Sequence, residues 1–91
     1  METTGSKLTD LSDVELIHLA LEQNQAAYIV LYTRYNAGVK NHISRYVAQK
    51  EDIEDIALES FQKAFSQIGT YRAEFKFSTW LYRIARNTAF D

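Results

Sequence analysis

The C-terminal stretch FKFSTWLYRIARNTAFD brings cationic and aromatic side chains close together. If it is a helix with 100° per residue, its aliphatic residues share one side and its cations share the other. The first side is Leu81, Ile84, Ala85 and Thr88, and the second is Thr79, Tyr82, Arg83, Arg86 and Asn87, with Trp80 at the border. Flat rings interleaved with guanidinium groups suit unpaired bases and phosphates. The pattern therefore indicates a surface for single-stranded nucleic acid.

A structural alternative accounts for the same residues. Trp80 can be a core residue whose indole N–H donates to a carbonyl, while the arginines only keep the helix soluble. Composition does not decide between these two interpretations.

A polar stripe on the preceding predicted helix is a second candidate surface. The apolar face of that helix is Ile53, Ala57, Phe61, Ala64, Phe65 and Ile68. The opposite face is Asp55, Glu59, Gln62 and Ser66, with Leu58 exposed beside it. Most such stripes only face solvent. An acidic face beside an outward leucine is also typical of a partner surface, so both interpretations stay open.

The elements that position these residues are predicted to be helices. The chain has 91 residues, no proline and only three glycines, which leaves little turn chemistry for hairpins. We therefore expect one all-α domain, a small bundle of about four helices.

Local signals predict the helix ends. Ser12 and Glu15 form a capping box ahead of a short first helix whose apolar positions are Val14, Ile17 and Leu21. A long second helix is predicted from the N-cap Asn24 to Tyr46, interrupted by Gly38, where a kink is possible. Further caps are predicted at Asp52 and Ser78, and a stop at Gly69.

Charge is unevenly distributed along the sequence. The net charge of minus 2 argues against a general nucleic-acid binder. Residues 1–62 carry five Lys or Arg against ten Asp or Glu, whereas residues 63–91 carry five against two. The basic character is therefore expected to lie in the C-terminal third.

Enzymatic and metal sites are the least supported possibilities. Cysteine is absent, and His18 and His42 have no second histidine at helical ligand spacing. No nucleophile motif such as G-x-S-x-G is present. We expect no catalytic residue, no metal and no cofactor. Because no signal peptide and no long apolar run is present either, we expect a cytoplasmic protein without a membrane partner.

The order of these motifs resembles a known family. DIEDIALESFQKAF followed by YRAEFKFSTWLYRIARNTAFD is similar to region 2 of the extracytoplasmic function (ECF) group of the sigma-70 family, the bacterial transcription initiation factors. The resemblance covers residues 13–91, with residues 1–12 expected to be a flexible N-terminus. It implies a helical bundle that docks on the β′ coiled coil of core RNA polymerase, and that recognises and helps to melt the minus-10 promoter element.

The resemblance also implies roles for particular residues. The polymerase-binding candidates are Asp55, Leu58, Glu59 and Gln62. The DNA-binding candidates are Tyr71, Arg72, Lys76, Thr79, Trp80, Tyr82, Arg83, Arg86 and Asn87. In the family, the loop from Tyr71 to Phe77 would receive a flipped base of the non-template strand, with Tyr71 and Asn87 lining the pocket.

The chain departs from the family pattern at several positions. Leu58 stands where the family usually carries glutamine, and Ala73 and Phe75 replace a usual glycine and a usual small residue. Such factors normally continue into a second helical domain that reads the minus-35 element, and the chain stops at NTAFD without it. We therefore expect it to be part of a longer protein. An anti-sigma factor is a further implied partner, and the alternative function is a helical protein-binding adaptor that does not bind DNA.

Overall fold

The computed structural model describes residues 8–91, in which four α-helices and no strand occur. The helices are α1 (Asp13–Leu21), α2 (Gln25–Ile43), α3 (Lys50–Ser66) and α4 (Phe77–Phe90), with a short 3-10 helix η2 (Ile68–Thr70) between α3 and α4. The prediction of an all-α bundle is confirmed. Within the described part of the chain, no helix is long and apolar enough to cross a membrane.

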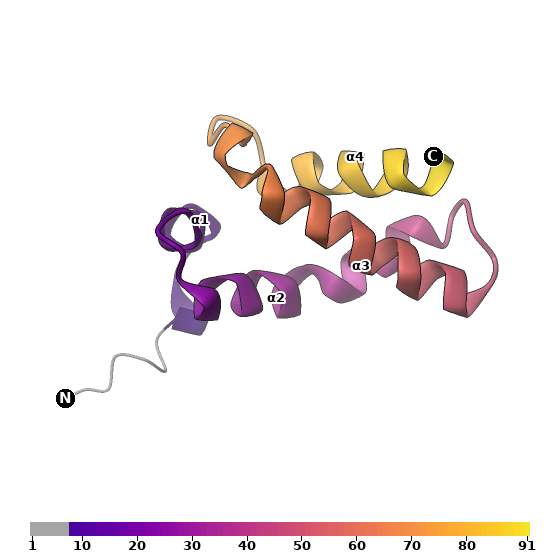
Figure 1. Ribbon diagram of the computed structural model, residues 1–91, viewed down its shortest axis with the longest axis horizontal. Helices are drawn as coiled ribbons and strands as arrows, with labels where there is room; N and C mark the ends of the chain where they lie inside the picture. Colours follow the sequence, from indigo (N-terminus) through magenta and orange to yellow (C-terminus); the bar gives the residue numbers. More distant parts are fainter. Residues whose placement is uncertain (1–7) are drawn as a thin grey trace.

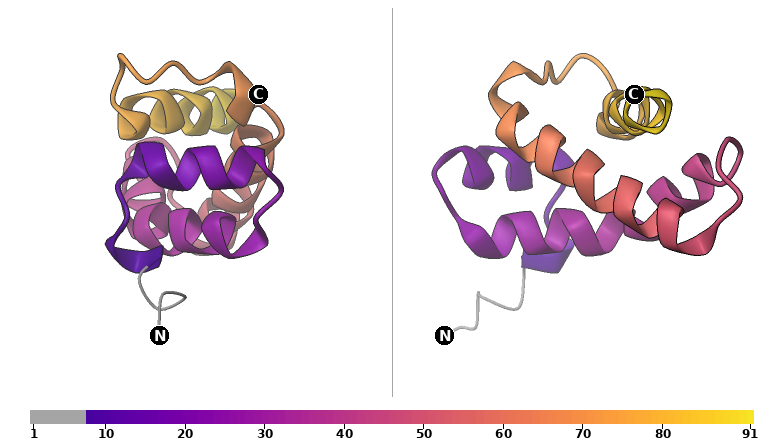
Figure 2. Two further views of the ribbon diagram at one scale, coloured as in Figure 1. Left: turned by 90° about the vertical axis from the view of Figure 1, so that its left-hand side faces the viewer. Right: turned by 45° about the vertical axis from the view of Figure 1, so that its right-hand side comes forward.

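The bundle is built around α2, which contacts each of the other three helices (Figure 1). Helix α1 crosses one end of α2 and is seen end-on where α2 runs across the view. Helices α3 and α4 pack against each other and against α2, and Figure 2 shows α4 lying over both. Helix α3 also contacts the N-terminal half of α2, where Tyr28 meets Phe65 and Tyr32 meets Phe61.

The core is formed by one apolar stripe from each helix. Its largest fully buried side chains come from all four helices, so no pair of helices forms the core alone. They are Leu16, Leu31, Val39, Ile43, Ser60, Phe61 and Leu81. Ser60 was not predicted in the core; its hydroxyl donates to the carbonyl of Ile56, at 2.6 Å, and so needs no water.

The first two caps are confirmed. The Glu15 amide donates to Ser12 Oγ at 3.2 Å, and the Ser12 amide donates to Glu15 Oε1 at 2.9 Å, which completes the capping box. The Ala27 amide donates to Asn24 Oδ1 at 3.1 Å. Helix α2 runs through Gly38 without a break and ends at Ile43, so the predicted extension to Tyr46 is wrong.

The predicted ends of α3 and α4 are wrong. Helix α3 begins at Lys50 after Gln49, not after Asp52, and ends at Ser66. Helix α4 begins at Phe77 after Lys76, so Ser78 lies inside its first turn. Gly69 lies in η2 with a negative φ, where it ends no helix. Neither Gln49 nor Lys76 caps its helix with a side-chain hydrogen bond, and Asp52 lies with Glu51 in the first turn of α3, where carboxylates favour the positive end of the helix dipole.

The first helix faces the core with a different stripe from the one predicted. Leu16, Ile17 and Ala20 are buried, whereas Val14 is 39% exposed and Leu21 is 46% exposed. Spacings of three and four residues are compatible with both sets. The packing of α1 across α2 buries the set with Leu16 and Ala20 and leaves Val14 and Leu21 exposed. Residues 8–12 also differ from the expected flexible N-terminus: residues 8–10 form a 3-10 turn, and the Arg34 guanidinium donates to the Thr9 carbonyl. Residues 1–7 lie outside the described residues.

Candidate nucleic-acid interface

The outer face of α3 carries the predicted polar stripe. Asp55, Leu58, Glu59 and Gln62 are all exposed, and Leu58 is exposed by 54%. Glu59 pairs with Lys63 one turn later at 3.4 Å, which is an exposed ion pair of little energetic value. The predicted orientation of the stripe is confirmed. Its role in binding a partner stays a prediction.

A ring cluster joins the start of α4 to the loop before it. The ring centroids of Tyr71, Phe77 and Trp80 lie 5.4 to 5.6 Å apart, in tilted or edge-on arrangements. Phe77 is buried, and its ring also contacts Tyr35 of α2, with centroids 5.3 Å apart. Edge-on pairs of this kind stabilise a fold by about 0.5 to 1.5 kcal/mol each beyond their buried area. The loop is thus fixed to the bundle by aromatic contacts.

Trp80 is partly a core residue and partly a surface residue, so both interpretations of the sequence apply to it in part. One side of its half-buried ring packs in the cluster, as a core residue would. The ring also lines a surface hollow of about 150 Å³. Trp80 is therefore held in one orientation while part of its ring faces the outside.

That hollow is lined by rings, hydroxyls and guanidinium groups. Its residues come from the loop and from one face of α4: Thr70, Arg72, Phe75, Thr79, Trp80 and Arg83. Four of these were DNA-binding candidates. An aromatic face beside hydrogen-bond donors and cations can stack a base and hold its phosphate.

Thr70 and Phe75 line the hollow but were not among the candidates. Both lie outside the helices that periodicity could place, and only the aromatic pattern FKF hinted at Phe75, which is 59% exposed. A loop residue reaches a site through the path of the backbone, which helical spacing does not describe.

The loop between η2 and α4 is stabilised by its own hydrogen bonds. The Tyr71 hydroxyl donates to the Phe75 carbonyl, and Arg72 pairs with Glu74 at 3.3 Å. Burial, and then the Asp13 carboxylate, raise the pKa of Tyr71, so its hydroxyl stays protonated at neutral pH. The Arg72 pair is exposed and weak, and its guanidinium can exchange Glu74 for a phosphate.

Tyr71 and Asn87 do not share a pocket. Tyr71 lines a broad hollow of about 360 Å³ with Asp13, Tyr35 and the loop. Asn87 instead lines a hollow with Lys63, Gln67 and Asp91, at the other end of α4. The two residues therefore line different hollows in this structure, and their joint contact with one flipped base stays a prediction. Asn87 follows Trp80 by seven residues, about 10 Å along the helix, which separates it from the loop.

Tyr82 packs against α2 more than it faces outward. Its ring stacks on His42, with centroids 5.1 Å apart and planes at 14°. A Cβ added to Gly38 would lie 2.2 Å from Tyr82 Oη. Gly38 is thus what lets Tyr82 approach α2 closely, and it explains a glycine inside a straight helix.

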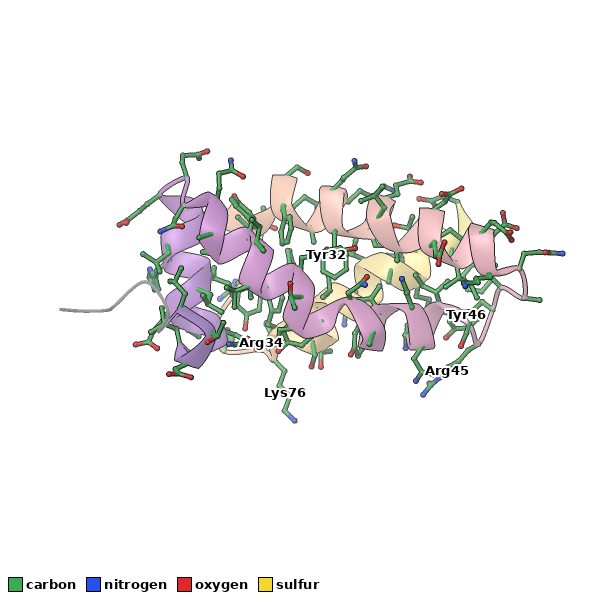
Figure 3. The ribbon with its side chains drawn as sticks, turned by 90° about the horizontal axis from the view of Figure 1, so that it is seen from below. Tyr32, Arg34, Arg45, Tyr46 and Lys76 are labelled. Atoms are coloured by element: carbon green, nitrogen blue, oxygen red, sulfur yellow. The ribbon has the colours of Figure 1, made fainter. Side chains whose placement is uncertain are left out.

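The remaining candidates are exposed. Arg83, Arg86 and Asn87 are exposed on α4, and the Lys76 side chain extends away from the bundle (Figure 3). The Arg86 guanidinium lies over the rings of Phe90 and Tyr46, 5.5 and 6.0 Å from their centroids. Among residues 8–91, no group of three or more His, Asp or Glu side chains could hold a metal ion.

Comparison with known proteins identifies the family of this bundle. The family model described as Sigma-70 region 2 matches residues 31–91, which include α3, the loop and α4. The chain belongs to the sigma-70 region 2 family. The resemblance drawn from the motifs is thereby confirmed.

Relatives of this region 2 chain carry sigma-factor names. It is 42% identical over 79 residues to the ECF RNA polymerase sigma-E factor of Haemophilus influenzae, covering 87% of the chain and 41% of that relative. It is 39% identical to the sigma-E factor of Escherichia coli K12, with the same coverage. It is 35% identical to the RNA polymerase sigma-H factor of Pseudomonas aeruginosa, covering 90% of the chain and 42% of that relative. The chain thus spans about two fifths of the length of these relatives.

A solved structure of a region 2 domain is also similar. It is the NMR structure of an engineered region 2 of sigmaE in complex with GTAAAA, at a TM-score of 0.81 and 40% identity. The match covers 88% of this chain and 83% of that one. The four-helix arrangement is therefore that of sigma region 2.

Proposed function

We propose that this domain binds core RNA polymerase, and recognises and helps to melt the minus-10 promoter element. The observation that carries the proposal is the hollow between the loop and α4, where Trp80 faces Arg72 and Arg83. The similar engineered region 2 of sigmaE was solved in complex with GTAAAA. The role is one of binding, with no chemical step assigned to any residue.

The hollow would capture one unpaired base of the non-template strand. Trp80 would stack on it, the hydroxyls of Thr70 and Thr79 would meet its edge, and Arg83 would hold the neighbouring phosphate. In a duplex the base must first be unpaired and unstacked, which costs a few kcal/mol. The domain alone therefore favours a strand that is already open, and polymerase would be needed for melting.

The outer face of α3 would bind the polymerase. Asp55, Glu59 and Gln62 face outward beside an exposed Leu58, and the core does not need any of them. An acidic rim around one apolar side chain suits a basic partner surface, for which the β′ coiled coil is our candidate. Activity on promoter DNA would place the protein in the cytoplasm. An anti-sigma factor remains a further proposed partner without an assigned surface.

Strand binding tests the DNA half of the proposal. Fluorescence anisotropy of the 91-residue chain with labelled single strands and matching duplexes should show tighter binding to single strands. Trp80→Ala should lower that affinity by about 1 to 3 kcal/mol, the value of one stacked base. Leu58→Ala, on an exposed position of α3 outside the hollow, is the control and should bind as the wild type does.

A measurement of base preference separates residues that recognise a base from residues that bind the strand backbone. In a panel of strands varied at each position, Arg83→Ala should weaken all strands alike, whereas Thr79→Ala should flatten the preference at one position. Asn87→Ala should leave that preference intact, because Asn87 lies outside the hollow. If no strand binds better than its duplex, the adaptor function replaces this proposal.

A second binding assay tests the polymerase half. Replacing both Asp55 and Glu59 by Lys should weaken binding to the β′ coiled coil and leave the helical circular dichroism spectrum unchanged. Ser66→Ala, at the C-terminal end of the same stripe but not among the polymerase-binding candidates, is the control. Equal capture of the double variant and the wild type would contradict the assignment.

A further inference from the structure

The C-terminal halves of α2 and α4 form a seam of rings. Tyr82 of α4 lies over Gly38 and stacks on His42 of α2. Tyr46, just after α2, meets Phe90 with centroids 5.0 Å apart. Positions 38, 42 and 46 thus meet positions 82, 82 and 90, in the same order along the sequence. The two helices therefore run side by side in the same direction.

Two arginines lie on this seam. Arg86 is held over the rings of Tyr46 and Phe90, and Arg45 is the exposed neighbour of Tyr46. Burial, and then the charges of Arg45 and Arg86, lower the pKa of His42, so both guanidinium groups lie near that imidazole. His42 itself stays neutral at pH 7 and adds no charge.

No carboxylate neutralises these arginines within residues 8–91. The ion pairs of that part of the chain involve Arg34, Lys63 and Arg72. The sequence has no Asp or Glu between Glu22 and Glu51, and none from Phe77 to Phe90. Helices α2 and α4 are therefore both free of acidic residues, whereas the acidic residues lie on α1, α3 and the connecting segments.

The basic surface continues along the length of α4. Figure 3 shows Lys76 and Arg45 extending on the same side of the molecule, from the start of α4 and from the end of α2. Arg83 and Arg86 follow Lys76 along α4, and Arg86 lies over the ring of Tyr46, the neighbour of Arg45. A chain of cations with neighbouring rings thus leads from the hollow to α2.

We propose that the DNA-binding surface continues from α4 onto the C-terminal end of α2, where Arg45 and Arg86 hold backbone phosphates of the strand whose base enters the hollow. The inference rests on the proposed function and extends it to a residue, Arg45, on another helix. Arg86 loses little conformational freedom on binding because two rings already restrain it.

The reach of this surface can be estimated. Trp80 and Arg86 are six residues apart, about 9 Å along a helix, and the Tyr46 ring lies 6.0 Å beyond the Arg86 guanidinium. At the roughly 3.4 Å per nucleotide of a fully stacked strand, that path corresponds to about four nucleotides, and a more extended strand covers it with fewer. About four nucleotides beyond the captured base are therefore the most that a strand needs to reach Arg45.

The test measures how binding to single strands depends on salt. Arg45→Ala should lower the slope of log affinity against log salt concentration by about 0.7, the value of one phosphate contact on a single strand. The ratio of wild-type to variant affinity should then change about threefold between 50 and 200 mM salt. Arg45→Lys should keep the wild-type slope, and base preference should not change in either variant. Thermal melting checks that each variant is folded.

A matched control and a length series sharpen the test. Lys50→Ala removes one exposed cation from the start of α3, and should keep the wild-type slope. With strands extended stepwise at one end or the other, the Arg45→Ala effect should arise at only one end, within about four added nucleotides.

The outcomes are distinguishable. If the wild type prefers single strands but Arg45→Ala and Lys50→Ala have equal slopes at all lengths, this inference is overturned and the proposed function stands. If the wild type binds no strand better than its duplex, both are overturned.

Discussion

The outward side chains of α3 and α4 differ in how they are held. On α3, Asp55, Leu58 and Gln62 extend into solvent, and the stripe's ion pair, between Glu59 and Lys63, stays within the helix. On α4, Trp80 packs in a ring cluster and Tyr82 stacks on His42. The first face can therefore change without loss of structure. On the second, a substitution that alters binding also alters packing.

This difference sets a condition on interpreting variants. A loss of polymerase binding after a change on α3 reports the contact itself. A loss of DNA binding after a change at Trp80 or Tyr82 includes the cost of a loosened fold, so stability must be measured in parallel. The four predictions below probe that contrast.

Truncation of the buried face of α3 should have the largest effect. Phe61 is only 2% exposed, and its ring meets Tyr32 and Phe65. Phe61→Ala should lower the free energy of unfolding by about 3 to 5 kcal/mol. Gln62→Ala, the next residue but on the outer face, should change it by about 0.5 kcal/mol or less. Chemical denaturation measures both, and an unchanged midpoint for Phe61→Ala would show that the faces are wrongly assigned.

Equivalent truncations on the two outer faces should differ. Trp80→Ala removes ring contacts with Tyr71 and Phe77, and should cost about 1 to 3 kcal/mol of unfolding free energy for the two pairs. Leu58→Ala should cost about 0.5 kcal/mol or less. Trp80→Phe keeps a ring and should recover part of the loss. Equal costs for Trp80→Ala and Leu58→Ala in thermal melts would remove the contrast between α3 and α4.

A change at Gly38 tests the approach of α4 to α2. Alanine inside a helix normally adds about 1 kcal/mol over glycine, but here its Cβ would lie 2.2 Å from Tyr82 Oη. Gly38→Ala should therefore destabilise the fold by about 1 to 2 kcal/mol. In a Tyr82→Phe background the nearest ring atom is Cζ at 3.4 Å, and the same change should be neutral or stabilising. A double-mutant cycle of Gly38→Ala and Tyr82→Phe, measured by chemical denaturation, tests whether the two positions are coupled. If the two changes in unfolding free energy are additive, the proposed clash is contradicted.

The smallest effect is expected from pH. The pKa of His42 is lowered in the fold, so the unfolded chain, with a pKa of about 6.5, takes up the proton first. Stability from this residue is therefore full above about pH 6.5 and falls as the pH drops below it. His42→Phe keeps a stacked ring and should lessen the loss of stability between pH 7.5 and 5.5. His18→Phe on the exposed face of α1 is the control, and an equal change in both variants would assign the dependence elsewhere.

The spacing of apolar residues predicted the buried and exposed faces of α3 and α4 well, whereas the local signals predicted the helix ends poorly. The burial of Phe61 and the exposure of Leu58 on α3 followed from helical periodicity, because both sides of one helix are fixed by 100° per residue. The caps predicted at Asp52 and Ser78 failed, because α3 and α4 begin after Gln49 and Lys76, which make no side-chain cap hydrogen bond, so the capping preference decided neither start. The stop predicted at Gly69 failed because α3 already ends at Ser66.

The candidate site was predicted in part, because helical periodicity places residues of one helix face but not residues of a loop. Trp80, Arg83 and Thr79 share one face of α4, and sequence alone placed them together. The loop residues Thr70 and Phe75 join them only through the path of the backbone between η2 and α4. Asn87 was assigned to the same pocket through a family resemblance, which carries no distance along the helix.

The sequence by itself determined the helical class, the family and the outward direction of the acidic stripe, since composition, motif order and periodicity are local properties. It also suggested that the basic charge lies in the C-terminal third. Only the tertiary structure brought α2 beside α4, and with it Arg86 over the ring of Tyr46, the neighbour of Arg45. The physical reason is that this pairing is made by contacts between residues far apart in the chain, such as Gly38 with Tyr82, which no local pattern encodes.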